Sequence, residues 1–170
     1  MRSPALIFEF DPELVPPFQL VKIYLGYVTD KLPAWLFTQS SLKELLIVHS
    51  TASFEPPDKF WKFSTQLEYF YLVNNTLNGD ISNAVLSSTF VWLVANNLRG
   101  DVPRISPKVV VLNLRRNSLS GSISPLLCDN MTDKSNLVYL SLGCNNLSGE
   151  LTNCWITGNR WFMLLWNTIA

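Results

Sequence analysis

The chain has 170 residues, of which 48% are hydrophobic and only 15% are charged, and its formal net charge is zero. A neutral chain lacks the basic surface that nucleic acids and anionic membranes attract, so we expect neither partner. Three cysteines and a single, distant histidine lack the spacing of zinc ligands, so no metal site and no cofactor are expected.

The two ends of the chain carry no targeting pattern. Leu6, Phe8 and Phe10 alternate in a short segment that is predicted to be extended and to end at Pro16-Pro17. Acidic residues interrupt the first apolar run, and the last one, residues 161–166, is too short to cross a bilayer. The sequence therefore predicts neither a signal peptide nor a transmembrane span in this chain, and no direct membrane insertion by it.

From residue 18 onward the chain consists of an internal repeat. Its clearest copies are LEYFYLVNNTLNGDI (67–81), VVVLNLRRNSLSGSI (109–123) and LVYLSLGCNNLSGEL (137–151). Each has the pattern L-x-x-L-x-L, then an asparagine, then L-x-G-x-I or L. Less regular copies complete a set of about six repeats, which start near residues 18, 42, 67, 86, 109 and 137. The equivalent positions 28, 50, 75, 96, 117 and 145 are 21 to 28 residues apart, as in leucine-rich repeats.

This period predicts an α/β-type solenoid, a leucine-rich-repeat superhelix with the shape of a horseshoe. The L-x-x-L-x-L segments form short parallel strands on the concave face, with the leucines inside the coil and the x residues outside. One coil cannot bury its own apolar face, so neighbouring coils stabilise each other. We expect the solenoid to cover residues 1–155 without caps, and residues 156–170, which lose the register, to be a divergent C-terminal tail.

The asparagine that follows each strand has a structural explanation. Its side-chain amide can bond backbone groups of its own turn and of the next coil, which satisfies polar groups buried inside the bend. We therefore predict an asparagine ladder made of Asn75, Asn96, Asn117 and Asn145.

The same register identifies a candidate binding surface on the outward positions of the strands. Tyr69, Tyr71, Phe90 and Trp92 form an aromatic patch across two adjacent coils, and Tyr24 occupies an equivalent position in the first coil. Exposed aromatic residues on a concave sheet are typical of a ligand surface. Alternatively, the rings cover one another, or the register slips in the short fourth repeat. Arg115 ends the fifth strand and can hold a carboxylate, although a solvated sheet edge is the simpler explanation.

Several segments resemble the plant-specific class of leucine-rich repeats, and in particular the ectodomains of plant leucine-rich-repeat receptor-like proteins. These segments are VPPFQL (15–20), LPAWL (32–36), NGDIS (78–82), PRISP (103–107), SGSISPLLC (120–128) and LSGELTNCW (147–155). The resemblance implies a location on the extracellular side of the plasma membrane, N-glycosylation, one membrane span in the full-length protein, and signalling through partner kinases.

The resemblance also implies a function in recognition. The residues themselves give no indication of catalysis, because the sequence contains no nucleophile paired with a base, no phosphate loop and no kinase signature. We expect a non-catalytic extracellular recognition module, not an enzyme. It would bind a peptide, glycan or protein ligand, or a co-receptor kinase, on its concave face in defence or developmental signalling. The alternatives are a soluble inhibitor of a cell-wall-degrading enzyme and a truncated, non-functional receptor fragment.

Two kinds of covalent modification fit an exported protein. Sequons predict glycosylation at Asn74, Asn130 and Asn146, although sequons also arise by chance in asparagine-rich repeats. Cys128 and Cys154 occupy similar points of successive coils, so a disulfide between them is predicted outside the cell. Two buried thiols are the alternative.

Overall fold

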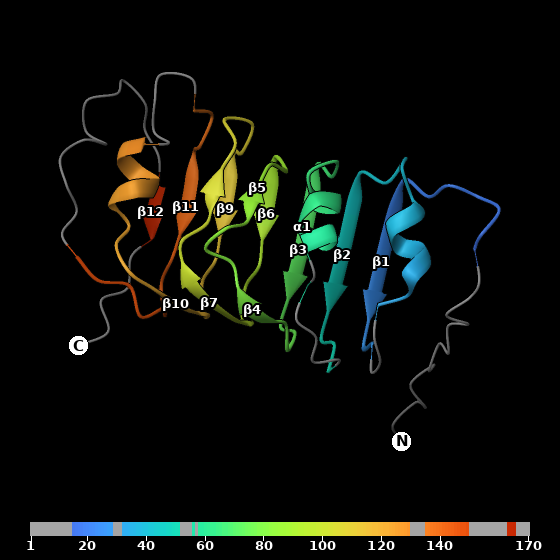
Figure 1. The fold of residues 1–170 in the computed structure, drawn as a ribbon, viewed down its shortest axis with the longest axis horizontal. Coiled ribbons are helices and arrows are strands. Elements are labelled where there is room, and N and C mark those ends of the chain that lie inside the picture. Colours follow the sequence, from blue (N-terminus) through green and yellow to red (C-terminus); the bar gives the residue numbers. More distant parts are fainter. Residues whose placement is uncertain are drawn as a thin grey trace.

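The computed structural model describes residues 15–28, 32–51, 56, 58–129, 135–149 and 163–165. Its main element is a seven-stranded parallel sheet in the order β1-β2-β3-β6-β9-β11-β12 (Figure 1). The strands are β1 (Lys22–Gly26), β2 (Glu44–Val48), β3 (Tyr69–Val73), β6 (Phe90–Trp92), β9 (Val111–Asn113), β11 (Tyr139–Ser141) and β12 (Met163–Leu165). Each strand pairs with the strand of the next coil, so the predicted leucine-rich-repeat solenoid is confirmed.

The strand pairing places the outward residues of successive coils in two continuous rows. One row contains Lys22, Glu44, Tyr69, Phe90, Val111 and Tyr139. The other contains Tyr24, Leu46, Tyr71, Trp92, Asn113 and Ser141. The register does not slip in the fourth repeat, because Phe90 is opposite Tyr69 and Trp92 is opposite Tyr71.

The inward residues of these strands form one continuous core. At most 3% of each side chain is exposed for Leu42, Leu45, Ile47, Leu67, Phe70, Leu72, Val91, Leu93, Val109, Leu112, Leu114, Leu137, Leu140 and Leu142. The fourth repeat has Ser88 where the others have an apolar residue, and the hydroxyl of Ser88 donates to the Ser64 carbonyl at 3.0 Å. Burial of this serine is tolerated because its polar atom is hydrogen-bonded.

A second, smaller sheet forms where the L-x-G-x-I segments stack. It contains β10 (Ser118–Ser120), β7 (Asn97–Asp101) and β4 (Asn78–Asp80) in that order. Gly100 has φ +90°, and a Cβ there would overlap the Asp80 carboxylate and the Ser82 hydroxyl of the preceding coil. The glycine of the repeat is therefore required for both its backbone conformation and the close approach of the next coil.

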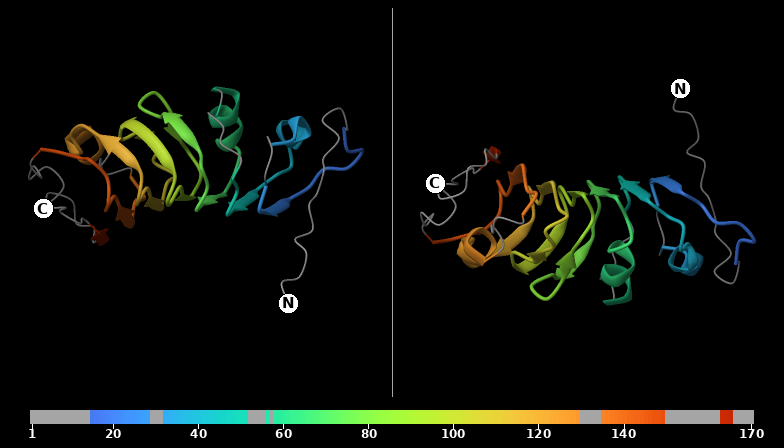
Figure 2. Two further views of the ribbon diagram at one scale, coloured as in Figure 1. Left: turned by 90° about the horizontal axis from the view of Figure 1, so that it is seen from below. Right: turned by 90° about the horizontal axis from the view of Figure 1, so that it is seen from above.

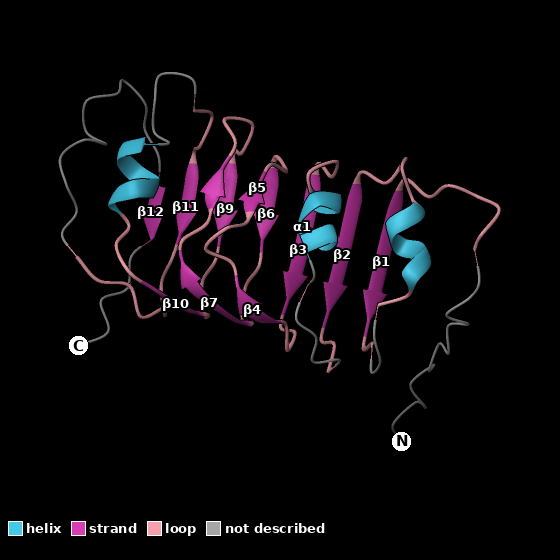
Figure 3. Ribbon diagram, viewed as in Figure 1, coloured by secondary structure: helices cyan, strands magenta, loops and turns pink. Residues whose placement is uncertain are grey.

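The side of the molecule opposite the main sheet changes along the solenoid (Figures 2 and 3). Three coils carry short helices there: η1 (Ala34–Thr38), α1 (Asp58–Ser64) and η2 (Pro125–Asp129). In the intervening coils, β5 (Val85–Leu86) and β8 (Arg104–Ile105) pair as a two-stranded sheet. The helix α1 occupies the coil whose second half lacks the L-x-G-x-I pattern, so the irregular repeat has a different outer wall.

The four ladder asparagines are hydrogen-bonded to the backbone inside the bend. The Asn117 amide donates to the carbonyls of Leu93 and Leu114, at 2.7 and 3.0 Å, and its Oδ1 accepts from the Leu98 N–H at 3.1 Å. Asn75, Asn96 and Asn145 likewise donate to carbonyls of the coil before them: those of Ile47, Leu72 and Leu114. In the second repeat, the Ser50 hydroxyl donates to the Val28 carbonyl at 2.6 Å.

These bonds connect each asparagine to the preceding coil, so the prediction that they reach the next coil was wrong in direction. The reason is the geometry of a parallel strand, in which the N–H and C=O of one residue point to the same side. The Leu93 N–H donates towards the following coil, to the Asn113 carbonyl. The Leu93 carbonyl therefore also faces the following coil, where the Asn117 side-chain amide donates to it.

The residue before each ladder position has a left-handed backbone. The φ angles lie between 52° and 58° at Tyr27, His49, Asn74, Ala95, Arg116 and Cys144. None of these is glycine, although such residues rarely adopt positive φ. Six coils thus bend in the same way at the end of the strand, and the hydrogen bonds of the bend maintain a conformation that the local sequence does not favour.

Strand β12 lies inside the segment that the sequence predicts to be a tail. Its residues pair in parallel with β11, Tyr139 opposite Met163 and Ser141 opposite Leu165. The boundary after residue 155 therefore does not mark the end of the parallel sheet. The predicted extended segment at Leu6–Phe10 lies outside the described residues.

Candidate functional site

Five aromatic residues form a continuous cluster on the concave sheet, which we call the ring row: Tyr69, Tyr71, Phe90, Trp92 and Tyr139. The rings of Tyr69 and Phe90 are parallel, with their centroids 4.8 Å apart. The centroid of the Tyr71 ring is 6.2 Å from that of Tyr69 and 6.3 Å from that of Trp92. The ring planes of Tyr71 and Trp92 are inclined by 72°, so this pair is T-shaped. The rings pair across neighbouring strands because these are about 4.8 Å apart, close to an aromatic stacking distance.

Trp92 extends the ring row over a third strand. Its ring is parallel to that of Tyr139, with the centroids 6.2 Å apart. Tyr139 lies on β11, two strands from β6, which corresponds to roughly 9.5 Å of sheet. The intervening strand carries Val111 and Asn113 at its outward positions, and these small side chains leave room for the indole.

The prediction of the binding surface included four of these five residues and omitted Tyr139. Tyr139 also occupies an outward position of the repeat, but the long spacing between the fifth and sixth repeats puts it far from Trp92 in the sequence. The small outward residues of the fifth repeat are the signal that could have indicated the contact.

The rings cover one another without leaving the surface. All five are half-buried. The rings therefore cover one another in part, and in part remain exposed as a surface that a ligand can reach. Burial, more than nearby charge, raises the pKa of the Tyr71 phenol above its ordinary value. The phenol is therefore a neutral hydrogen-bond donor throughout the physiological pH range.

A polar cluster lies on the concave sheet beside the ring row. The Lys22 ammonium is 2.9 Å from the Glu44 carboxylate, and the Tyr24 hydroxyl donates to the same carboxylate at 2.7 Å. The hydrogen bond from Lys22, followed by that from Tyr24, lowers the pKa of Glu44. The same contacts raise the pKa values of Lys22 and Tyr24. The concave sheet thus changes from charged in the first two coils to aromatic in the coils that follow.

The titration of Glu44 tests this cluster. We expect NMR of the side-chain carboxyl carbon to give a pKa below the ordinary glutamate value, and Lys22→Met to move it back towards that value. Because the folded pKa is lowered, the stability contributed by Glu44 is present above the unfolded pKa and is lost as pH falls through the folded one. Tyr24→Phe should have a smaller effect, and Lys43→Met, an exposed lysine nearby, should have none. An unchanged pKa in Lys22→Met would show that the ion pair does not form.

The other two candidate binding residues do not belong to the ring row. Tyr24 is 58% exposed and is separated from the row by β2. Arg115 follows β9, is half-buried, and its Nε has no hydrogen-bond partner among the described residues. The structure therefore brings Tyr69, Tyr71, Phe90 and Trp92 together, but not Tyr24 or Arg115.

The predicted modification sites are only partly described. Asn74, which directly follows β3, and Asn146, which follows the ladder residue Asn145, are both exposed, whereas Asn130 lies outside the described residues. Cys128 is disulfide-bonded, and its predicted partner Cys154 also lies outside them.

The described part of the chain contains neither a cluster of metal ligands nor a membrane-spanning helix. Its His, Cys, Asp and Glu side chains form no group of three or more that could hold a metal ion. None of its helices has the length and apolar character needed to traverse a bilayer.

The sequence is similar to those of known leucine-rich-repeat proteins. A family model described as Leucine Rich Repeat matches residues 108–130. The chain is 32% identical over 147 residues to Receptor-like protein EIX2 of Solanum lycopersicum, an alignment that covers 84% of this chain and 14% of that protein. It is 35% identical over 163 residues to Receptor like protein 21 of Arabidopsis thaliana, covering 92% of this chain and 16% of that protein. The chain thus spans about one-seventh of the length of these relatives.

Two solved receptor structures share this fold. The structure of a TDR receptor superposes with a TM-score of 0.67 at 22% identity and covers 85% of this chain and 25% of that one. A second structure superposes with a TM-score of 0.58 at 21% identity. It is the LRR ectodomain of the plant membrane receptor kinase GASSHO1/SCHENGEN3 from Arabidopsis thaliana, in complex with CASPARIAN STRIP INTEGRITY FACTOR 2. That superposition covers 76% of this chain and 16% of the other. At these identities the likeness concerns the fold.

Proposed function

Because the chain belongs to the leucine-rich-repeat receptor-like proteins of plants, we propose that it forms part of a non-catalytic extracellular recognition module. Its concave face binds a peptide or an extended protein segment, and the module acts at the outer side of the plasma membrane. The observation that carries this proposal is the ring row, five half-buried aromatic residues on β3, β6 and β11.

The ring row has the chemistry of a protein-binding surface. Tyrosine and tryptophan are enriched at interfaces because each combines a large apolar area with a hydrogen-bond donor and few rotatable bonds. The mutual packing of Tyr69, Phe90, Trp92 and Tyr139 fixes their rotamers before a ligand arrives. A preformed surface requires little ordering on binding, which favours affinity.

The orientation of the rings favours a peptide over a glycan. A sugar ring stacks on a free aromatic face, but the faces of Tyr69 and Phe90, and those of Trp92 and Tyr139, are turned towards each other. The surface therefore offers ring edges and the phenol and indole donors. Peptide carbonyls can accept from these donors, while apolar side chains lie between the ring edges.

The margins of the ring row provide polar contacts for the ends of such a ligand. On one side lie Lys22, Glu44 and Tyr24, which are joined by hydrogen bonds. At the carboxyl end of β9, the strand between Trp92 and Tyr139, Arg115 can pair with a carboxylate of the ligand or of a co-receptor kinase. Glycans at the exposed Asn74, directly after β3, and at the exposed Asn146, beyond the bend that follows β11, would leave the centre of the sheet free.

A selection experiment tests this function. Random linear 12-residue peptides displayed on phage are selected on the wild-type chain, and the enriched peptides are synthesised and titrated by calorimetry. We expect micromolar binding that weakens at least tenfold in Phe90→Ala and changes less than twofold in Val85→Ala, an exposed apolar residue of β5. Equal affinities for wild type and Phe90→Ala would refute binding at the ring row. If no peptide is enriched and the chain instead binds sugars on an oligosaccharide array, the ligand is a glycan and the proposed peptide ligand is wrong.

A further inference from the structure

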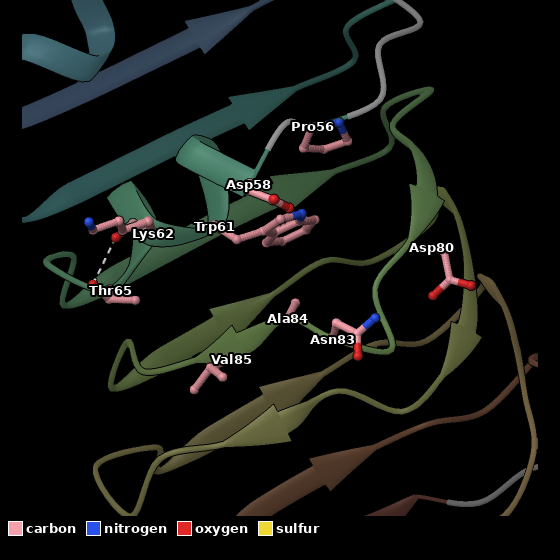
Figure 4. A pocket seen from close by; sticks show the side chains of 9 residues that line it. All are labelled: Pro56, Asp58, Trp61, Lys62, Thr65, Asp80, Asn83, Ala84 and Val85. Atoms are coloured by element: carbon pink, nitrogen blue, oxygen red, sulfur yellow. Dashed lines mark hydrogen bonds between the residues drawn. The ribbon is translucent and has the colours of Figure 1, made fainter.

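A second candidate site lies on the opposite side of the solenoid, where no residue of the ring row takes part. A hollow of about 490 Å³ separates α1 from the segment that joins β4 to β5 (Figure 4). It exists because one coil carries a helix on this side and the following coil carries the short strand β5. A helix is about 10 Å wide with its side chains, so it stands above the flatter neighbouring coil.

The hollow has one aromatic wall. Trp61 extends from α1 towards Asn83 and Ala84 of the facing segment (Figure 4). Its ring is held by edge contacts with Phe60, at 5.4 Å and 85°, and with Phe70, at 6.5 Å and 80°. The 8% of Trp61 that remains exposed therefore belongs to a fixed surface.

Two carboxylates also belong to the hollow, one beside Trp61 on α1 and one apart from it on β4 (Figure 4). Asp58 of α1 and Asp80 of β4 both line the hollow and are exposed, so a partner can reach them. The Asp80 Oδ1 accepts hydrogen bonds from the Ser82 hydroxyl, at 2.5 Å, and from the Ser82 N–H, at 2.8 Å. These bonds, the hydroxyl first, lower the pKa of Asp80 and keep it ionised. One cation, Lys62, also lines the hollow, which leaves one excess negative charge among its charged residues.

We propose that this hollow binds an arginine side chain presented by a segment of a protein partner on the convex face. A guanidinium group matches the site because it pairs with carboxylates through a planar array of N–H donors and also stacks against indole. Pro56 and Val85, at the rim, offer apolar contacts to the flanking residues of such a segment. This partner is independent of the ligand of the ring row.

The test uses N-acetyl-arginine methylamide and its neutral isostere, N-acetyl-citrulline methylamide. Each is titrated into the nitrogen-15-labelled full chain, and the indole N–H signal of Trp61, assigned with Trp61→Phe, is followed by NMR. We expect a saturable shift with the arginine compound and none with citrulline. Asp58→Asn should weaken binding at least threefold, whereas Lys62→Gln should strengthen it, because the competing cation is removed.

Three outcomes would overturn the proposal: no shift with arginine, equal shifts with both compounds, or the same affinity in Asp58→Asn as in the wild type. The pentapeptide Ac-Ala-Ala-Arg-Ala-Ala-NH2 should bind several-fold more tightly than the amino-acid derivative, and equal affinity would refute a partner segment. Phe90→Ala should leave all these titrations unchanged, so the result is separate from that of the ring row.

Discussion

Replacing Asn117 by alanine is expected to lower the free energy of unfolding by about 2–4 kcal/mol, because the change leaves several buried backbone groups without partners. The carbonyls of Leu93 and Leu114 lose their donor, and the Leu98 N–H loses its acceptor. Asn117 is 9% exposed, so water cannot replace all these bonds. Two of the lost hydrogen bonds join neighbouring coils, so the substitution weakens the contacts between repeats on which a solenoid depends.

Urea unfolding of the full chain measures this effect, with Asn97→Ala as the matched control. Asn97 is also an asparagine near a coil bend, but its side chain is exposed, so its replacement should change the free energy of unfolding by less than about 0.5 kcal/mol. In Asn117→Ala, the Leu98 amide should also lose protection from hydrogen exchange. Equal stabilities of the two variants, with Leu98 still protected, would show that the ladder bonds do not hold the coils together.

The sequence predicted the architecture well because the repeat contains the same information several times. Apolar residues at nearly all inward positions and a glycine at Gly100, Gly121 and Gly149 define strand, bend and stacking in the regular copies. Irregular repeats were predicted less well. The coil that contains α1 has no L-x-G-x-I segment, and nothing in its residues fixed a helix of seven residues.

The left-handed bends were beyond any prediction from local sequence. The residue there is Tyr27, His49 or Ala95 in three of the coils, side chains with no shared preference for positive φ. The conformation is imposed by hydrogen bonds between coils, such as that from the Ala95 N–H to the Arg115 carbonyl at 2.9 Å. It is therefore a property of the stack and not of one repeat.

The candidate sites differ in the same respect. Four residues of the ring row followed from the register because each belongs to a regular strand. Tyr139 did not, since its contact with Trp92 depends on the size of side chains on the strand between them. The convex hollow could not be predicted either, because it arises from the difference in thickness between a helical coil and its neighbour.

Trp92 is the residue through which the ring row becomes one surface. It contacts Tyr71 on one side and Tyr139 on the other, and thus joins β3, β6 and β11. Residues of this kind, central, aromatic and surrounded by other contacts, dominate the energetics of interfaces. Its removal should therefore affect ligand binding more than folding.

Trp92→Ala is expected to weaken binding of a peptide selected on the wild-type chain by roughly 30-fold or more, which corresponds to at least about 2 kcal/mol. The free energy of unfolding should fall by only about 1–2 kcal/mol, because the side chain is half-buried on the sheet surface and outside the core. Calorimetric titration and urea unfolding on the same samples provide both values. Phe18→Ala, which removes a 53% exposed ring outside the row, should change binding less than twofold.

A second variant distinguishes the two roles of Trp92 if the alanine variant is poorly folded. Trp92→Phe retains a ring against Tyr139 but lacks the indole N–H, so it should fold normally. If the indole donates to a peptide carbonyl, Trp92→Phe should bind the peptide several-fold more weakly than wild type, while Tyr139→Phe tests the neighbouring phenol in the same way. Wild-type affinity in both Trp92→Ala and Trp92→Phe would place the peptide away from the ring row, and a loss of folding as large as the loss of binding would assign Trp92 to the core.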